Sequence, residues 1–299
     1  MTAATPNVLK PEGSTTMGVV PGTFAQALLL SRYQFRDYLR SRRFVLMMLI
    51  VAAIGGILTF VLAYFNSNAA VQGLLSSSDA FYGSAWAGGV TIVIIFAGII
   101  FGGDAIAGEF QNKTGYFLMG LPIKRTTVYV GKFLAALAAS LVAVFFYLAI
   151  LLANGTYYLH GNAFPVALGE SFLISLLYLF ALLGSVFLFS SLFKNSLYAV
   201  LVVAVLFLFG FSLLQGVTTS LVKIEPWFII TYADQVIGYP FLATLPPHVS
   251  TVTVMGGRGA GFTTTTYNPT YPEGFAIMFG YFLLTALAGL WLFEREEFT

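Results

Sequence analysis

The sequence predicts an all-α integral membrane protein with six transmembrane helices, and three observations lead to this fold class. The 299 residues have a mean hydropathy of +0.87, with 58% hydrophobic and only 9% charged residues, which is far from the balance of a soluble globular domain. Six apolar runs are each long enough, at about 20 residues, to cross a bilayer as a helix. The charged residues gather between these runs and distinguish the two sides of the membrane.

The amino end precedes the first apolar run and has two parts. Residues 1–22 are polar and rich in Gly, Pro and Thr, so we expect a flexible cytoplasmic tail rather than a secretory signal. In residues 23–43, apolar side chains share one side of a 3.6-residue helix, next to a stripe of arginines. This pattern predicts an amphipathic interfacial helix, and the alternative is that the arginines only flank and orient the first span. The stripe consists of Arg32, Arg36, Arg40 and Arg43.

Residues 44–299 form the predicted transmembrane domain. Only three residues, Lys194 to Ser196, separate the fourth apolar run from the fifth, which predicts a tight antiparallel hairpin. An even number of spans places both termini on one side of the membrane. The predicted spans are residues 44–65, 84–103, 133–153, 171–193, 197–215 and 274–293.

The loops differ strongly in positive charge. Twelve Lys and Arg residues fall on the side of the termini, and only Lys223 and Arg258 fall on the other. Because positively charged loops remain in the cytoplasm, we predict a multi-pass protein of the plasma (cell) membrane with both termini cytoplasmic. The outer side then carries a long loop, residues 216–273. Its first half predicts one or two short re-entrant helices, and its alternating Thr-rich second half favours a small β-hairpin or an irregular cap.

Several function classes lack their usual residues. None of the six runs contains an ionisable side chain, whereas ion-coupled carriers normally keep such groups inside the membrane. The chain has no cysteine, no HExxH spacing and no G-x-x-x-x-G-K-[ST] motif, and its two histidines fall in different outer loops. We therefore expect no catalytic residue, no metal site and no cofactor bound by this chain. The sequence assigns no substrate-binding residue.

The cytoplasmic segment between the second and third spans, residues 104–131, concentrates charge. Apolar side chains recur there at helical spacing among polar ones, and Pro122 marks a helix end. This pattern predicts an amphipathic docking surface that passes a partner's movement to the adjoining spans. For Glu109, an i+4 ion pair with Lys113 that only solvates the helix is the alternative. The candidate docking residues are Asp104, Ile106, Glu109, Phe110, Lys113, Phe117, Leu121, Lys124 and Arg125.

The run IAGEFQNKTGYFLMGLPIKRTTVYVGKF within and just beyond this segment resembles the cytoplasmic loop of type-2 ATP-binding-cassette (ABC-2) exporter permeases. In that family the second span leads into a glutamate-containing coupling helix, and a Leu-Pro turn with basic residues then precedes a Gly-Lys pair. The order of elements is also similar: an amphipathic elbow helix, six spans, a coupling helix after the second, and a large outer loop. The matching residues are Glu109, Gly115, Leu121, Pro122, Ile123, Lys124, Arg125, Gly131 and Lys132.

This resemblance implies a permease subunit of an ATP-driven exporter. Two copies of a cytoplasmic ABC ATPase subunit would hold ATP and Mg, and would pair with this chain and a second copy of itself or a paralogous permease. Residues 105–120 would form the coupling helix, with Glu109 at the ATPase interface. The uncharged spans favour an amphipathic or hydrophobic cargo, such as a lipid, glycolipid, peptide or drug, within membrane lipid and with no nucleic-acid partner. The alternatives are an ion-coupled secondary carrier or channel, or a membrane anchor or assembly subunit acting through the outer loop.

Overall fold

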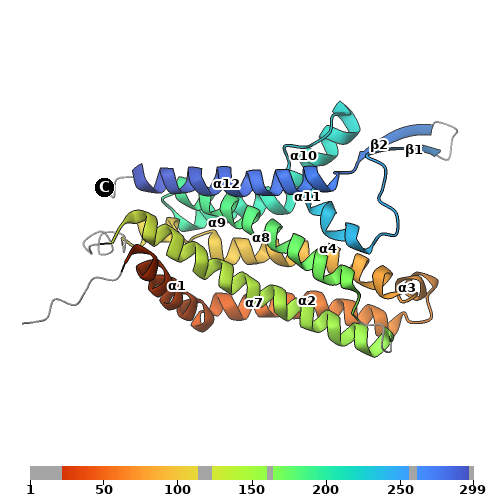
Figure 1. Cartoon of the computed structure of the whole chain (residues 1–299), viewed down its shortest axis with the longest axis horizontal. Coiled ribbons are helices and arrows are strands. Elements are labelled where there is room, and N and C mark those ends of the chain that lie inside the picture. The colour runs from red at the N-terminus through yellow and green to blue at the C-terminus, as the bar shows by residue number, and fades with distance from the viewer. Residues whose placement is uncertain (1–21, 114–122, 160–163, 256–260, 296–299) are drawn as a thin grey trace, which may run out of the picture.

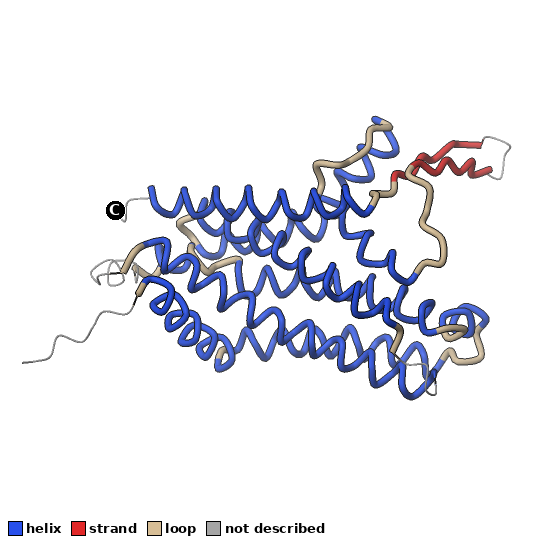
Figure 2. Tube along the Cα trace, viewed as in Figure 1, coloured by secondary structure: helices blue, strands red, loops and turns tan. Residues whose placement is uncertain are grey.

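The protein is a bundle of long helices that lie side by side (Figures 1 and 2). A computed structural model describes residues 22–113, 123–159, 164–255 and 261–295. Six helices in the described residues are long and apolar enough to cross a membrane, which confirms the six predicted spans. They are α2 (Arg42–Tyr64), α4 (Ser78–Gly102, continued to Gln111), α7 (Arg125–Leu159), α8 (Val166–Leu192), the run Ser196–Val222 and α12 (Tyr271–Arg295).

Most of these helices are longer than the apolar runs that predicted them. The fifth helix consists of α9 (Ser196–Val205), the π-helical turn η1 (Leu206–Gly210), α10 (Phe211–Val217) and a second π-helical turn η2 (Thr218–Val222). The predicted loop start at residue 216 is therefore wrong. Hydroxyls of Thr218 and Thr219 donate to carbonyls one turn earlier, so these polar residues stay in the helix. The helix ends at Lys223, which has a left-handed φ of 55°.

Helix α1 (Thr23–Arg40) precedes the first span and packs along α7. Gly131 of α7 permits this approach, because a Cβ there would lie 3.0 Å from the carbonyl oxygen of Ala27. Ser41 accepts a hydrogen bond from the N–H of Phe44 and so caps the next helix. Arg43 therefore belongs to α2, and its assignment to the interfacial helix is wrong. The arginines that do lie on α1, all exposed, are Arg32, Arg36 and Arg40.

The centre of the bundle consists of α4, α7 and α8, which are the most buried of the six candidate spans. Small residues let α4 and α8 approach closely: a Cβ added to Gly98 would lie 2.3 Å from a methyl group of Leu182. Some polar groups inside the core bond to one another, as where the Trp86 indole donates to Ser171 Oγ at 3.0 Å.

The described chain begins and ends at one end of the bundle, and the opposite end carries the short elements (Figure 1). These are α3 (Ala69–Leu74), α11 (Ile230–Ala233), the 3₁₀-helix η3 (Asp234–Phe241), β1 (Val249–Met255) and β2 (Gly261–Tyr267). Short helices are thus present in the first half of the long loop, where they were predicted, and η3 packs on α4 and α8. The second half is an antiparallel hairpin in which Val249 pairs with Tyr267, so of the two predicted alternatives the structure has the hairpin, which adds two strands to an otherwise helical fold.

Candidate functional site

The candidate site is the segment that follows α4. It lies at the end of the bundle where the described chain begins and ends. We call residues 103–113 the connector; it contains the single-turn helix α5 (Ala107–Gln111). The predicted coupling helix of residues 105–120 is therefore described only over this one turn. Residues 114–122, which include the predicted docking residues Phe117 and Leu121, lie outside the described residues.

An ion pair with little exposure joins the connector to α7. Lys132 Nζ lies 2.5 Å from Glu109 Oε1 and donates a second hydrogen bond to the Ala105 carbonyl at 2.7 Å. The side chains of Lys132 and Glu109 are only 7% and 15% exposed. Glu109 pairs across to α7 rather than along its own helix, because α5 ends at Gln111 and Lys113 lies beyond it with a left-handed φ of 56°.

A second ion pair joins the connector to α2. Arg43 Nη1 lies 2.5 Å from Asp104 Oδ2. The Arg43 side chain is 52% exposed, so solvent screens this pair and it adds little stability. A small cavity of about 200 Å³ separates the two ion pairs from α1, and Gln34 and Tyr38 of α1 line it together with the four charged side chains.

Three further helices hold the connector through uncharged contacts. Ser190 Oγ of α8 accepts hydrogen bonds from the backbone N–H groups of Ile106 and Ala107, at 3.0 and 3.1 Å. These are the donors that the start of a helix leaves without an intrahelical partner. Gln111 Oε1 accepts from the N–H of Ser196 at the start of α9, and the Phe110 ring lies 6.3 Å from that of Phe293 in α12. The connector therefore contacts five of the six spans in addition to continuing α4.

The predicted docking residues differ in exposure. Ile106 is completely buried, so its assignment to a docking surface is wrong: Ser190 draws the start of α5 into the bundle and turns this side chain inward. Arg125 donates to the Glu294 carbonyl at 2.9 Å and ties the start of α7 to the end of α12. Lys113 and Lys124 are exposed. The partly buried members of the set are Asp104, Glu109, Phe110 and Arg125.

A second feature, a cavity of about 480 Å³, lies towards the other end of the bundle between α4, the fifth helix and the short helices of the outer loop. Asp234 is partly buried in its wall, and this burial raises the pKa of the carboxyl to about 7. Among the described residues Asp234 has no hydrogen-bond or ion partner. The lining residues are Thr91, Ile92, Ile95, Phe207, Leu208, Ser212, Gln215, Thr231, Asp234 and Gln235.

No motif in the sequence points directly to this cavity. Asp234 falls outside the six apolar runs, so a search for ionisable groups within the runs passes over it. The sequence does carry one sign of a buried carboxyl here, because Asp234 is the only charged residue in the apolar stretch FIITYADQVIGYPF. A carboxylate in such surroundings either forms a hydrogen bond or ion pair or has a raised pKa. The π-helical turn η1 supplies Phe207 and Leu208 to the wall, and such turns often occur at functional sites.

These features define a class: a multi-pass helical membrane protein in which the connector after α4 is attached to the other five spans. The comparisons with known proteins then identify the family. The family model described as "ABC-2 family transporter protein" matches residues 28–298. The chain belongs to the ABC-2 transporter family, as the run around Glu109 indicated, and it is the membrane component of an ABC transporter. Members of this family usually work with an ATPase subunit. Comparison with curated protein sequences gave no match.

Proposed function

We propose that this chain is the permease subunit of an ATP-driven exporter and that a separate cytoplasmic ATPase subunit drives it by binding at the connector. The observation that carries this proposal is the attachment of the connector to α2, α7, α8, α9 and α12. A segment attached to the bundle only at its two ends would bend when the ATPase subunit moves against it. A segment anchored on five helices transmits that push to the bundle as a rigid-body movement.

The anchoring contacts suit this task because several of them lie away from water. The Lys132–Glu109 pair is nearly buried, so it is screened much less than a surface pair. The two bonds to Ser190 fix the backbone of α5 rather than a side chain, so the position of the whole turn is set. Asn112 and Lys113, which follow this anchored turn, and Lys124, which precedes α7, are exposed, and we propose them as part of the surface that meets the ATPase.

The cavity beside Asp234 supports an amphipathic cargo. Its volume of about 480 Å³ falls within the range of small-molecule sites. Ile92, Ile95, Phe207 and Leu208 offer an apolar wall, and the hydroxyl and amide side chains opposite offer hydrogen bonds. A lipid, glycolipid, peptide or drug combines these two kinds of surface. In this proposal two permease subunits face each other, two ATPase subunits hold ATP and Mg, and the cargo crosses towards the outer side.

Charge reversal at the exposed basic side chains tests the docking surface. Lys113→Glu combined with Lys124→Glu should lower co-purification of the permease with its ATPase at least tenfold, and should lower ATP hydrolysis in proteoliposomes to the same extent. Lys223→Glu is the matched control, because Lys223 is equally exposed but lies beyond the fifth helix, on the predicted outer side. Unchanged co-purification of the double variant, or equal loss with the control, would contradict docking at the connector.

An ion-coupled carrier is the second candidate, and Asp234 is the observation in its favour. A carboxyl with a pKa of about 7 exchanges a proton near neutral pH, as a proton-coupled site requires. The two candidates differ in their energy source. Transport by the purified chain in proteoliposomes that is driven by a pH gradient, needs no ATPase and is lost in Asp234→Asn would favour the carrier. Transport that requires the ATPase subunit and ATP would favour the exporter.

A further inference from the structure

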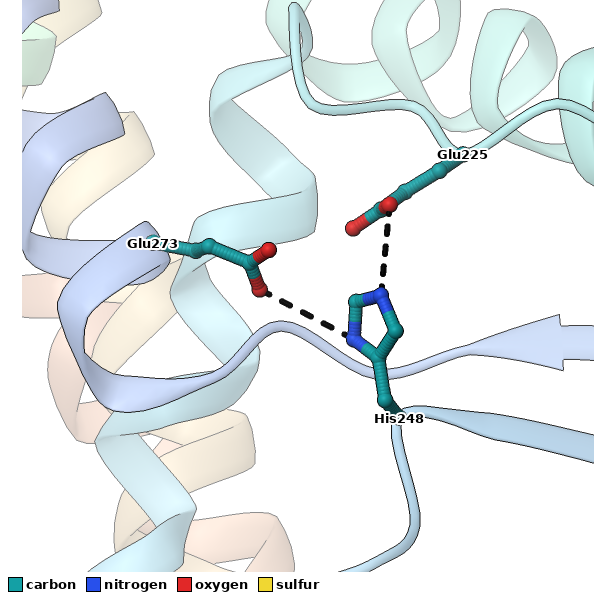
Figure 3. Close-up of side chains that lie close together, drawn as sticks. All are labelled: Glu225, His248 and Glu273. Atoms are coloured by element: carbon teal, nitrogen blue, oxygen red, sulfur yellow. Dashed lines mark ion pairs between the residues drawn. The ribbon is translucent and has the colours of Figure 1, made fainter.

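Three segments of the outer side that are far apart in the sequence bring their side chains together in one place (Figure 3). Glu225 follows the fifth helix, His248 precedes β1, and Glu273 lies in the first turn of α12. One ligand atom from each residue lies within 4.8 Å of the other two. We propose that Glu225, His248 and Glu273 bind a divalent first-row metal ion, and that Zn²⁺ is the ion this donor set favours.

The distances match a coordination site better than a set of hydrogen bonds. His248 Nε2 lies 3.3 Å from Glu225 Oε2, and His248 Nδ1 lies 3.8 Å from Glu273 Oε2. Charge-assisted hydrogen bonds are shorter, at about 2.7–2.9 Å. In a tetrahedral zinc site, bond lengths of about 2.0–2.2 Å place neighbouring ligand atoms about 3.3 Å apart. The His248 Nε2–Glu225 Oε2 edge already has this length, and the Glu273 carboxylate, whose ligand atom lies within 4.8 Å of the other two, reaches it by moving inward.

Each of the three groups is held from outside the cluster through one atom and keeps another atom for a metal. The Tyr232 hydroxyl donates to Glu225 Oε1 at 2.6 Å, which leaves Oε2 facing the ring. Thr270 donates from its N–H and its hydroxyl to Glu273 Oε2, which leaves Oε1.

The histidine is oriented in the same manner. His248 Nδ1 lies 3.0 Å from the carbonyl oxygen of Asn268. A proton on Nδ1 is donated to that carbonyl, and the neutral imidazole then directs the lone pair of Nε2 towards Glu225. Metal-binding histidines almost always use their second ring nitrogen in this way, which fixes the tautomer and the plane of the ring.

The charges and the donor types select the ion. Within the described residues neither carboxylate forms an ion pair with Lys or Arg, and both lie beside the His248 imidazole. A divalent cation would neutralise them. Two carboxylates with one imidazole suit Zn²⁺ and its first-row neighbours, whereas Mg²⁺ and Ca²⁺ prefer oxygen ligands alone. Water would complete a tetrahedral site.

Such an ion would tie together parts of the outer loop that few other contacts join. It would link the turn after the fifth helix and the base of the β-hairpin to the start of α12. Tyr267 at the end of β2 already donates to the Lys223 carbonyl at 2.6 Å and joins the first two of these parts. The site would therefore restrict movement of the outer loop relative to the sixth span. This inference concerns the outer side and does not depend on the ATPase or on the cargo.

Zinc binding by the full-length chain tests the proposal. The protein would be purified in detergent with a tag that lacks histidine, stripped with a chelator, and titrated with Zn²⁺ alone by calorimetry. We expect one Zn²⁺ per chain and a rise in the apparent melting temperature that the chelator reverses. His248→Ala should weaken binding at least tenfold, and His160→Ala, which removes the only other histidine in the sequence, should leave it unchanged.

A conservative variant guards against misfolding. Glu225→Gln keeps the size of the side chain and an acceptor for Tyr232, so this variant should elute as the wild-type protein does on size exclusion and still lose Zn²⁺ affinity. Absence of stoichiometric binding by the wild type, or equal binding by the wild type, His248→Ala and Glu225→Gln, would overturn the proposal. A melting temperature that follows pH but not Zn²⁺ would also overturn it, because it would identify the cluster as an imidazolium bridging two carboxylates.

Discussion

Removal of the Glu109 carboxylate provides the sharpest test of how the connector is held. In Glu109→Gln the Lys132 ammonium, only 7% exposed, keeps its bond to the Ala105 carbonyl but loses its counter-charge. Breaking a buried ion pair from one side costs about 3–5 kcal/mol. Because Glu109 is 15% exposed and the glutamine amide can still accept a hydrogen bond, we expect the lower end, about 3 kcal/mol of unfolding free energy.

A double-mutant cycle isolates the interaction between the two side chains. Lys132→Met removes the charge and keeps the aliphatic stem, and the combined variant leaves no uncompensated charge. Its loss of stability should be smaller than the sum of the two single losses by about 1–3 kcal/mol. The measurement is reversible unfolding in mixed detergent–SDS micelles, followed by tryptophan fluorescence and circular dichroism.

Asp104→Asn is the matched control within the same connector. Its partner Arg43 is 52% exposed, so this variant should lose less than about 1 kcal/mol. Wild-type stability for Glu109→Gln, or strictly additive losses in the double variant, would refute the buried ion pair. The same reasoning makes Glu109→Arg unsuitable as a docking probe, because an arginine beside Lys132 would destabilise the connector before any partner binds.

Three further predictions concern other parts of the bundle. Burial raises the pKa of Asp234 from 3.8 to about 7, so the folded state binds the proton more tightly than the unfolded state. The stability of the fold should therefore fall, by at most about 4 kcal/mol, as the pH rises from about 4 to about 7. Asp234→Asn should lose this pH dependence in melting curves taken across that range. Gly98→Val should cost about 1–3 kcal/mol of stability by overpacking against α8. Gly88→Val should be nearly neutral, because a Cβ at Gly88 meets nothing within 4 Å. Similar melting temperatures for the two variants would contradict the close packing of α4 on α8 at Gly98. Ser190→Ala leaves two connector N–H groups without an acceptor and should cost about 1–3 kcal/mol of stability. The Ser185 hydroxyl bonds only within the same helix, so Ser185→Ala should change little. Hydrogen exchange of the connector amides separates the two outcomes.

The sequence by itself determined the number and order of the spans. A bilayer requires about 20 apolar residues in succession, and this is a local property that any window of the chain reveals. Ends of helices were less predictable: Ser41 ends one helix and caps the next, and the polar residues after Gln215 continue the fifth helix because their hydroxyls bond back to its carbonyls. The family resemblance around Glu109 was also visible in the sequence, since it rests on adjacent residues.

Only the tertiary structure decided which side chains meet. Hydrophobic periodicity placed Ile106 on a docking surface, yet the bond from Ser190 to the start of α5 turns that residue into the core. Glu109 and Lys132 stand 23 positions apart, and Glu225, His248 and Glu273 come from three separate segments, so no spacing rule joins them. Such contacts depend on how each helix is rotated and how closely its small residues allow a neighbour to approach. These quantities are set by the packing of the whole bundle and not by any single stretch of the chain.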